Sequence, residues 1–210
     1  WNRSQSFELI ERLQKQNPNL KIVIGGPEVS FETETSVECP VISGEGEKKW
    51  LEYLQIIDQG KVPSEEILNR WKSYGTDLPD LAPAYLEEDY SQLKNRIVYF
   101  ETSRGCPYLC SFCLSALDKT VRYFDDEVIY NQIKNLIDAG VGKFKFVDRT
   151  FNLKPGRMKA LMEWLSQFGD CEFHFEVVGD ILTPDILKFL ESVPPGMFQF
   201  EIGIQTTDET

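Results

Sequence analysis

Residues 103–115 read SRGCPYLCSFCLS and hold three of the five cysteines of this 210-residue chain. Cys106, Cys110 and Cys113 follow C-x3-C-x2-C spacing, and they come directly after an apolar, β-prone run at residues 97–100. Thiolates are soft ligands that select zinc, copper(I) or iron–sulfur clusters. Three thiolates on one short loop can hold three corners of a cubane cluster, which leaves the fourth iron open to a substrate.

Other side chains could close such a site. Cys171 would complete a four-cysteine cluster, and His174, the only histidine, would complete a zinc site. A disulfide is disfavoured by the odd number of cysteines and by the lack of a visible secretory signal. Cys39 and Cys171 are expected to be buried, inert thiols. The spacing by itself leaves an open cluster, a closed cluster and a zinc site as alternatives.

The loop resembles the signature of the radical S-adenosylmethionine (SAM) superfamily, which is C-x3-C-x-aromatic-C after the first strand of a barrel. The resemblance implies that Cys106, Cys110 and Cys113 hold a [4Fe–4S] cluster, whose open iron binds the amino and carboxylate groups of SAM. It also implies that one electron cleaves SAM to a 5′-deoxyadenosyl radical, which abstracts hydrogen from the substrate. Phe112 is then expected to lie against the adenine of SAM.

The overall composition is that of an ordinary globular protein, with 41% hydrophobic and 27% charged residues. No stretch approaches the roughly 20 apolar residues of a membrane span. No signal peptide is visible in a chain that begins at Trp1. We therefore expect no membrane partner and a cytoplasmic location, which suits reduced thiols. The net charge of −12 disfavours nucleic acid, because an acidic chain repels phosphate backbones.

Residues 1–60 are predicted to be part of a Rossmann-like domain. Helices and short strands alternate and are expected at residues 4–16, 20–24, 39–42 and 48–59. The stretches IVIGGPEVS and ISGEGE resemble the later half of the cobalamin-binding domain that precedes many radical SAM cores. The resemblance implies cobalamin as a further cofactor, with Gly25 and Gly26 letting the backbone approach its nucleotide tail. The Asp-x-His-x-x-Gly loop of that domain is absent, and so are its first strands.

Residues 61–95 are rich in proline and acidic residues, and they are predicted to form a surface linker with one helix at residues 64–71. Within this stretch, DLPDLAPAYL resembles the segment that leads into a radical SAM barrel. The predicted division is therefore a domain at residues 1–60, a linker at residues 61–95 and a barrel domain at residues 96–210.

From Arg96 onward the pattern is a βα repeat, which indicates an α/β fold with a parallel sheet. Strands are expected at residues 97–102, 143–147, 172–178 and 198–204, and helices at residues 125–139, 155–168 and 184–192. Superfamily barrels usually have six βα units, so the four units here predict a partial radical SAM barrel and a fragment of a longer chain. Its open parallel edges should make the isolated fragment self-associate.

One face of these strands carries charge. It is either an exposed sheet face at an open edge or a polar lumen that holds SAM, and the cysteine loop favours the lumen. The Gly-Gly-Glu loop of the superfamily is missing after the second strand, and Asp148 is expected to bind the SAM ammonium in its place. The alternative role for Asp148 is to cap the following helix. The fourth strand resembles the E-x-G-x-Q/E-S strand of cobalamin-type members, so Glu201 and Gln205 are expected to face the cofactor. Glu176 is a candidate for the ribose hydroxyls.

The sequence therefore predicts a radical SAM enzyme that cleaves SAM reductively and needs an electron donor. Its substrate would be a small molecule or a peptide, and methyl transfer and methylthiolation are among the reactions that the superfamily performs. The alternative from another class is a non-catalytic iron–sulfur or zinc-binding module. One scaffold supports many reactions, so the fold alone does not select among them.

Overall fold

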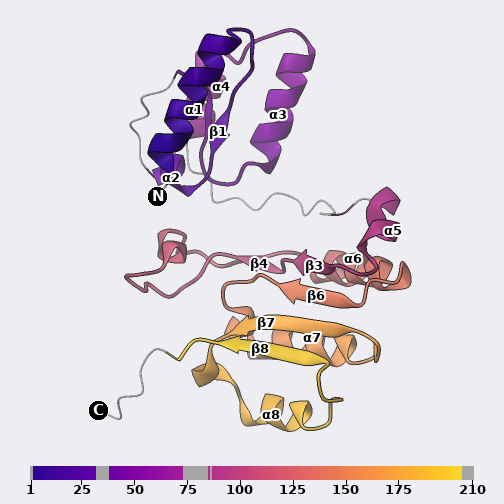
Figure 1. Ribbon diagram of the computed structural model, residues 1–210. Helices are drawn as coiled ribbons and strands as arrows, with labels where there is room; N and C mark the ends of the chain where they lie inside the picture. The colour runs from indigo at the N-terminus through magenta and orange to yellow at the C-terminus, as the bar shows by residue number, and fades with distance from the viewer. Residues whose placement is uncertain (1, 32–37, 73–84, 86, 205–210) are drawn as a thin grey trace. The chain divides into compact units, whose positions relative to one another are not determined.

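The computed structural model describes residues 2–31, 38–72, 85 and 87–204. The chain divides into two compact units, residues 1–79 and residues 80–210. Figure 1 shows the elements of both units.

The first unit is built around a two-stranded parallel sheet, in which Ile24 pairs with Val41 and Gly25 with Ile42. Figure 1 shows α1 and α3 on opposite sides of these strands. In chain order its elements are α1 (Arg3–Gln16), β1 (Ile24–Gly25), α2 (Pro27–Phe31), β2 (Val41–Ile42), α3 (Glu47–Asp58) and α4 (Glu65–Lys72). The strand expected at residues 20–24 is shorter than predicted, because only two residues of β2 pair with it.

The core of the first unit corrects the predicted linker. Trp71 lies in α4, within the stretch assigned to a surface linker, yet its side chain is fully buried against Ile42 and Tyr53. Its indole Nε1 donates a hydrogen bond to Glu52 Oε2 at 2.7 Å, and its carbonyl accepts from the backbone amide of Ser43 at 2.9 Å. Burying a large aromatic side chain outweighs the polar character of the surrounding sequence, so α4 packs as part of the first unit.

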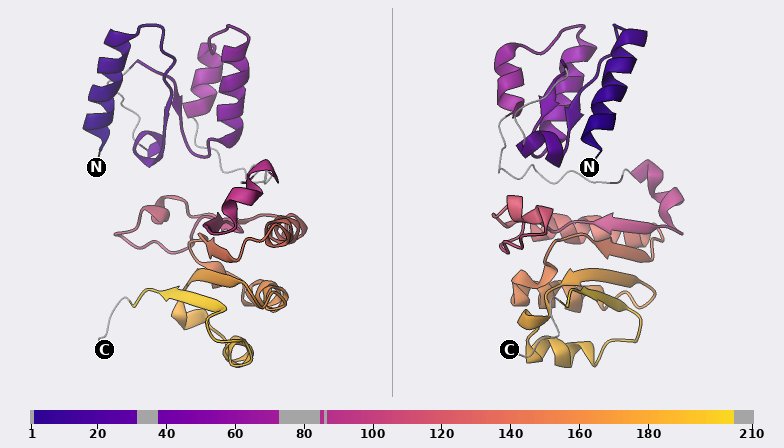
Figure 2. Two further views of the ribbon diagram at one scale, coloured as in Figure 1. Left: turned by 45° about the vertical axis from the view of Figure 1, so that its right-hand side comes forward. Right: turned by 60° about the vertical axis from the view of Figure 1, so that its left-hand side comes forward.

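The second unit is built on a four-stranded parallel sheet in the order β3-β6-β7-β8. These strands span Ile97–Phe100, Lys143–Phe146, Glu172–Val177 and Phe198–Ile202. The intervening helices are α6 (Asp126–Asp138), α7 (Pro155–Leu165) and α8 (Pro184–Leu190). Figure 2 shows all three helices along one face of the sheet. The predicted α/β fold with a parallel sheet is thus confirmed.

Alternation along the strands explains this arrangement. Phe144, Phe146, Phe173 and Phe175 are each at most 2% exposed and point to the face that the helices cover. Their rings stack across neighbouring strands, with 4.7 Å between the centroids of Phe146 and Phe175. Lysine, glutamate and histidine side chains occupy the alternate positions on the opposite face. Period-two alternation is what places the two sets on opposite faces.

Short elements complete the second unit. They are η1 (Glu87–Asp89), α5 (Tyr90–Leu93), β4 (Ser103–Arg104), η2 (Leu114–Leu117), β5 (Arg122–Tyr123), η3 (Phe151–Leu153) and η4 (Gly179–Ile181). At the outer edge of β3, the hydroxyl of Tyr85 accepts a hydrogen bond from the Tyr99 amide at 3.0 Å and donates one to the Tyr99 carbonyl at 3.1 Å. Tyr85 therefore occupies both backbone groups that Tyr99 directs away from the sheet.

Candidate cluster site

The cysteine loop leaves the carboxyl end of β3 and is closed at its base. Strands β4 and β5 pair in an antiparallel manner, and the Cys106 amide donates to the Asp118 carbonyl at 3.1 Å. Gly105 has φ of +88°, and a Cβ there would lie 2.1 Å from the Thr120 carbonyl oxygen. Only glycine tolerates both conditions, so Gly105 allows the two ends of the loop to meet.

The three loop cysteines are free thiols with different exposure. Cys106 is buried, whereas Cys110 and Cys113 are exposed. Backbone and hydroxyl hydrogen bonds from Ser115 lower the pKa of the Cys113 thiol, and the charge of Arg149 contributes to this lowering. A lower pKa favours the thiolate, which is the form that binds metals. Phe112 is 79% exposed, so its contact with an adenine remains a prediction.

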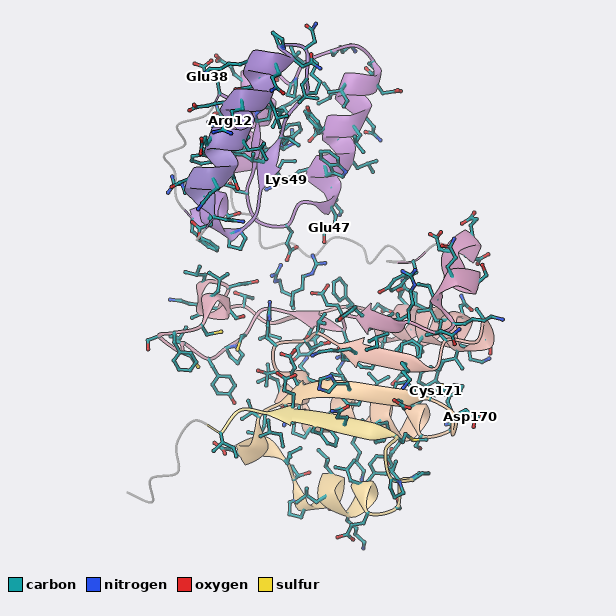
Figure 3. The ribbon with its side chains drawn as sticks, in the orientation of Figure 1. Arg12, Glu38, Glu47, Lys49, Asp170 and Cys171 are labelled. Carbon is teal, nitrogen blue, oxygen red and sulfur yellow. The ribbon has the colours of Figure 1, made fainter. Side chains whose placement is uncertain are left out.

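The two remaining cysteines differ from the loop thiols. Burial raises the pKa of both Cys39 and Cys171. Figure 3 shows Cys171 beside Asp170, at the amino end of β7 and away from the cysteine loop. His174 lies within β7, with its Nε2 3.5 Å from Glu201 Oε2. Neither Cys171 nor His174 therefore reaches the loop as a fourth ligand in this fold.

Across residues 2–31, 38–72, 85 and 87–204, no three histidine, cysteine or acidic side chains are grouped closely enough to hold a single metal ion. This applies to Cys106, Cys110 and Cys113 as well. A cluster distributes its cysteine ligands over several irons, so its ligands do not have to meet at one point as they do around a zinc ion.

Asp148, at the carboxyl end of β6, binds the end of the neighbouring strand. Its side chain is 1% exposed. Its Oδ2 accepts a hydrogen bond from the Thr102 amide at 3.0 Å, and its Oδ1 accepts from the hydroxyls of Thr102 and Ser103, each at 2.6 Å. Burial raises the pKa of Asp148, although these hydrogen bonds and the charge of Arg157 oppose the rise.

These contacts give Asp148 a structural role that the sequence did not predict. Its two carboxylate oxygens accept three hydrogen bonds within the protein, and its binding of the SAM ammonium stays a prediction. It does not cap the helices that follow, since neither η3 nor α7 has a side-chain cap. Instead it fixes Thr102 and Ser103, where the cysteine loop begins. Arg157 on α7 also holds Thr102 in place, because its Nη1 donates a hydrogen bond to the Thr102 hydroxyl at 3.0 Å.

The two alternate residues after Asp148 continue this pattern. Thr150 is 4% exposed, and its Oγ1 lies 3.7 Å from Cys106 Sγ. Asn152 is fully buried and binds the backbone just after β7. Its side-chain amide donates a hydrogen bond to the Val178 carbonyl at 2.7 Å and accepts one from the Val178 amide at 3.0 Å. The residues at 148, 150 and 152 thus contact the start of the cysteine loop, its first cysteine and the end of β7.

Sequence reasoning missed most of this network. The residues it overlooked are Thr102, Ser103, Thr150 and Asn152. The available signal was three polar residues at alternate positions directly after an apolar strand. Such positions at the carboxyl ends of parallel strands are where α/β folds place their sites.

The polar face of the sheet carries a ladder of ion pairs. Lys143 pairs with Glu172 at 2.9 Å, and Lys145 pairs with Glu201 at 3.3 Å. Glu176 lies directly opposite Glu201 on the neighbouring strand. The structure therefore brings these two predicted residues together on the face away from the helices. Gln205 lies outside the described residues.

The first unit has a hollow of about 680 Å³ at the carboxyl ends of its strands. Its lining is formed by Val23, Ile24, Gly25, Ile42, Gly44, Glu45, Gly46, Glu47 and Trp50. A Cβ on Gly25 would approach the Ile42 carbonyl oxygen to 3.2 Å, and Gly26 has φ of +104°. Figure 3 labels Glu47 and Lys49 at the start of α3, next to this part of the unit. Gly25 lines the hollow, whereas Gly26 forms the turn that follows.

Within the described ranges, no helix combines the length and apolar character needed to cross a membrane.

Comparisons with known proteins find relatives of this chain in sequence and in fold. The chain is 30% identical to an uncharacterised methyltransferase, PH0819, of Pyrococcus horikoshii over 67% of its length. It is 28% identical to the cobalamin-dependent radical SAM methyltransferase TokK of Streptomyces tokunonensis over 74% of its length. It superposes on the radical SAM methyltransferase TsrM of Kitasatospora setae, solved with tryptophan and a SAM analogue, with a TM-score of 0.69 at 15% identity.

The chain spans only part of these proteins: 36% of PH0819, 27% of TokK and 45% of the TsrM chain. The superposition on TsrM covers 99% of this chain. Residues 100–210, which run from the last residue of β3 through the cysteine loop and strands β6, β7 and β8, match the family described as the radical SAM superfamily. The chain belongs to the radical SAM superfamily.

Proposed function

We propose that this chain carries the cluster- and SAM-binding core of a radical SAM methyltransferase, with Cys106, Cys110 and Cys113 as the ligands of a [4Fe–4S] cluster. The observation that carries the proposal is the loop itself, which presents three free thiols at the carboxyl end of a parallel sheet. Cys171 and His174 are held elsewhere. Three protein ligands leave one iron open, unlike a closed four-cysteine site.

The donor set fits such a cluster. Two of the three thiols are exposed and so accessible to incoming iron, and the pKa of one of them, Cys113, is lowered. When bound, the cluster would supply one electron to SAM and hold its amino and carboxylate groups on the open iron. The protein contributes the closed base of the loop, where Gly105 and the Cys106 amide fix its two ends.

The polar face of the sheet is proposed to receive SAM. Glu176 and Glu201 lie side by side there, and carboxylates accept strong hydrogen bonds from ribose hydroxyls and ammonium groups. Phe112 is exposed on the cysteine loop and is proposed to contact the adenine. Gln205 remains a candidate from the strand motif. Lys143 pairs with Glu172 at the amino end of the sheet, whereas Lys145 pairs with Glu201 itself and places a positive charge beside the proposed site.

Cobalamin is proposed as the methyl carrier, held by the first unit. The hollow beside Gly25 is lined mainly by apolar side chains, including Ile42 and Trp50. A side chain on Gly25 would crowd the carbonyl of its strand partner Ile42, so the glycine allows the two strands to lie close together beside the hollow. TokK is described as a cobalamin-dependent methyltransferase, which supports methyl transfer as the reaction.

The proposal is tested by anaerobic reconstitution of the full-length protein with iron and sulfide. Wild type should develop broad visible absorbance and bind about four irons. Cys106→Ala, Cys110→Ala and Cys113→Ala should each lose the absorbance, whereas Cys39→Ala and Cys171→Ala should keep it. Loss of the cluster in Cys171→Ala would support a closed site, and a colourless protein that binds zinc would support the non-catalytic module.

A second measurement separates a radical SAM enzyme from a passive iron–sulfur protein. The paramagnetic resonance spectrum of the reduced cluster should shift when SAM is added, and 5′-deoxyadenosine should form with dithionite as the electron donor. An unchanged spectrum at saturating SAM would contradict the open-iron site. Retention of cobalamin after gel filtration, read from its own visible absorbance, tests the first unit independently.

The remaining partners are proposed on the same basis. The enzyme would need a one-electron donor and a small-molecule or peptide substrate, and its free thiols favour the reducing cytoplasm. The 210-residue chain alone is proposed to self-associate through β8, an edge strand whose Ile202 is 43% exposed, with Ile204 just beyond it 80% exposed. Sedimentation velocity at increasing concentration measures this, and a strictly monomeric chain would contradict it.

A further inference from the structure

Thr150 contacts Cys106 but is not one of the residues that the superfamily signature identifies. Thr150 comes from the β6–α7 connection, 44 residues from Cys106, and its Oγ1 is 3.7 Å from Cys106 Sγ. Both residues are buried, at 4% and 8% exposure. Cys106 is thus the one loop cysteine whose sulfur is enclosed by the protein and faces a hydroxyl there.

Which group donates the hydrogen bond between Cys106 and Thr150 depends on whether Cys106 is a thiol or a thiolate. The Thr150 hydroxyl also lies 2.8 Å from the Arg149 carbonyl, which can accept its single proton. While Cys106 is a thiol, its S–H can donate to Thr150 Oγ1, and the hydroxyl can donate to Arg149. A cysteine that binds iron has lost its proton, so the Thr150 hydroxyl is then the only donor available to this contact.

We infer that the Thr150 hydroxyl turns from the Arg149 carbonyl to the sulfur of Cys106 when the cluster is bound, and that this hydrogen bond raises the reduction potential of the cluster. An anionic sulfur is a stronger acceptor than a neutral carbonyl. Burial strengthens the bond, because the surroundings have a low dielectric constant. The inference rests on the proposed cluster ligands and concerns their tuning.

The direction of the effect follows from charge. Reduction adds one electron from an external donor to the cluster, and no proton leaves Thr150. The added negative charge on the cysteine sulfur strengthens a hydrogen bond that points at it, so the bond stabilises the reduced cluster more than the oxidised one. Hydrogen bonds to the sulfurs are a recognised means by which proteins set cluster potentials. Thr150 is therefore a tuning residue and does not contact the reacting atoms.

The test is the midpoint potential of the cluster, measured by redox titration with paramagnetic resonance detection on the full-length protein without SAM. Thr150→Val keeps the shape of the side chain and removes the hydroxyl, so it should make reduction about tenfold less favourable, which is about 59 mV for one electron. Thr150→Ser should restore the wild-type value. Thr120→Val, which changes an exposed threonine in the connection between β4 and β5, should leave the potential unchanged.

A second readout uses the exchangeable proton itself. In D2O, electron–nuclear double resonance of the reduced cluster should show a deuteron coupling in wild type and Thr150→Ser that is missing in Thr150→Val. An unchanged potential together with an unchanged coupling in Thr150→Val would overturn the inference and leave the ligand assignment intact. If Thr150→Val and Thr150→Ala both fail to hold a cluster, tuning is also overturned, because Thr150 is then needed for assembly. If wild type itself forms no cluster, the proposed function fails first.

Discussion

Asp148 accepts hydrogen bonds from both the backbone amide and the side-chain hydroxyl of Thr102, a residue 46 positions earlier in the chain. The contact joins the carboxyl ends of β6 and β3 at the point where the cysteine loop begins. A buried carboxylate with this number of donors is a structural anchor, and its removal leaves several polar groups without partners.

Replacing Asp148 with alanine should destabilise the second unit. The Thr102 amide and the hydroxyls of Thr102 and Ser103 would lose their acceptor in a site that is almost fully buried. Each unsatisfied buried donor costs roughly 1–3 kcal/mol, so we expect the free energy of unfolding to fall by about 3 kcal/mol. Urea denaturation measures this. Asp180→Ala, at an exposed position of the same unit, should change stability by less than about 0.5 kcal/mol, and an equal loss in both variants would argue against the anchor.

The stability contributed by Asp148 should depend on pH. Burial raises the pKa of Asp148 in the folded protein above its ordinary value of 3.8. The folded state therefore holds the proton more tightly than the unfolded state does. The resulting stability is fully present below pH 3.8 and is lost as the pH rises through the raised pKa. The free energy of unfolding of wild type relative to Asp148→Asn should increase on acidification, and a decrease would show that the hydrogen bonds outweigh burial.

Gly105→Ala should prevent closure of the cysteine loop. The new Cβ would lie 2.1 Å from a backbone oxygen, at a φ of +88° that alanine rarely adopts. We expect the variant to lose most of its iron on reconstitution, as measured by iron content and visible absorbance. Gly156→Ala is the matched control, because Gly156 lies in α7 with open space around its Cβ position. That variant should keep its cluster and gain about 0.5–1 kcal/mol of stability.

Trp71→Ala should unfold or strongly weaken the first unit. Trp71 is fully buried and donates its indole N–H to Glu52, and truncations of this size typically cost about 3–5 kcal/mol. Near-ultraviolet circular dichroism during urea denaturation follows the change. Trp50→Ala is the control, since Trp50 is 45% exposed and should cost far less. Comparable losses would mean that α4 does not belong to the core of this unit.

The sequence predicted the elements that depend on local periodicity. Alternating phenylalanines marked β6, β7 and β8, and Asp125 marked the start of α6, where it accepts hydrogen bonds from the amides of Glu127 and Val128. The cysteine loop was recognisable because its residues are contiguous. These features need no knowledge of what lies next to them in space.

The parts that escaped prediction depend on partners far away in the chain. The structural role of Asp148 was missed, because its burial beneath Thr102 and Ser103 is visible only once β3 and β6 are adjacent. Thr150 and Asn152 are common loop residues, and their roles come from Cys106 and Val178 on other connections. Trp71 appeared to belong to a polar linker, because its partners Ile42 and Tyr53 precede it by many residues.

Tyr85 makes the two edges of the main sheet different. Its hydroxyl forms hydrogen bonds with both backbone groups that Tyr99 directs outward, so these groups are not available to another strand at the β3 edge. At the opposite edge, β8, no side chain among the described residues is seen to play this part. A strand that paired with β3 at Tyr99 would first have to displace Tyr85, whereas pairing with β8 would displace no such contact. The two edges of the sheet therefore differ in how readily they can accept another strand.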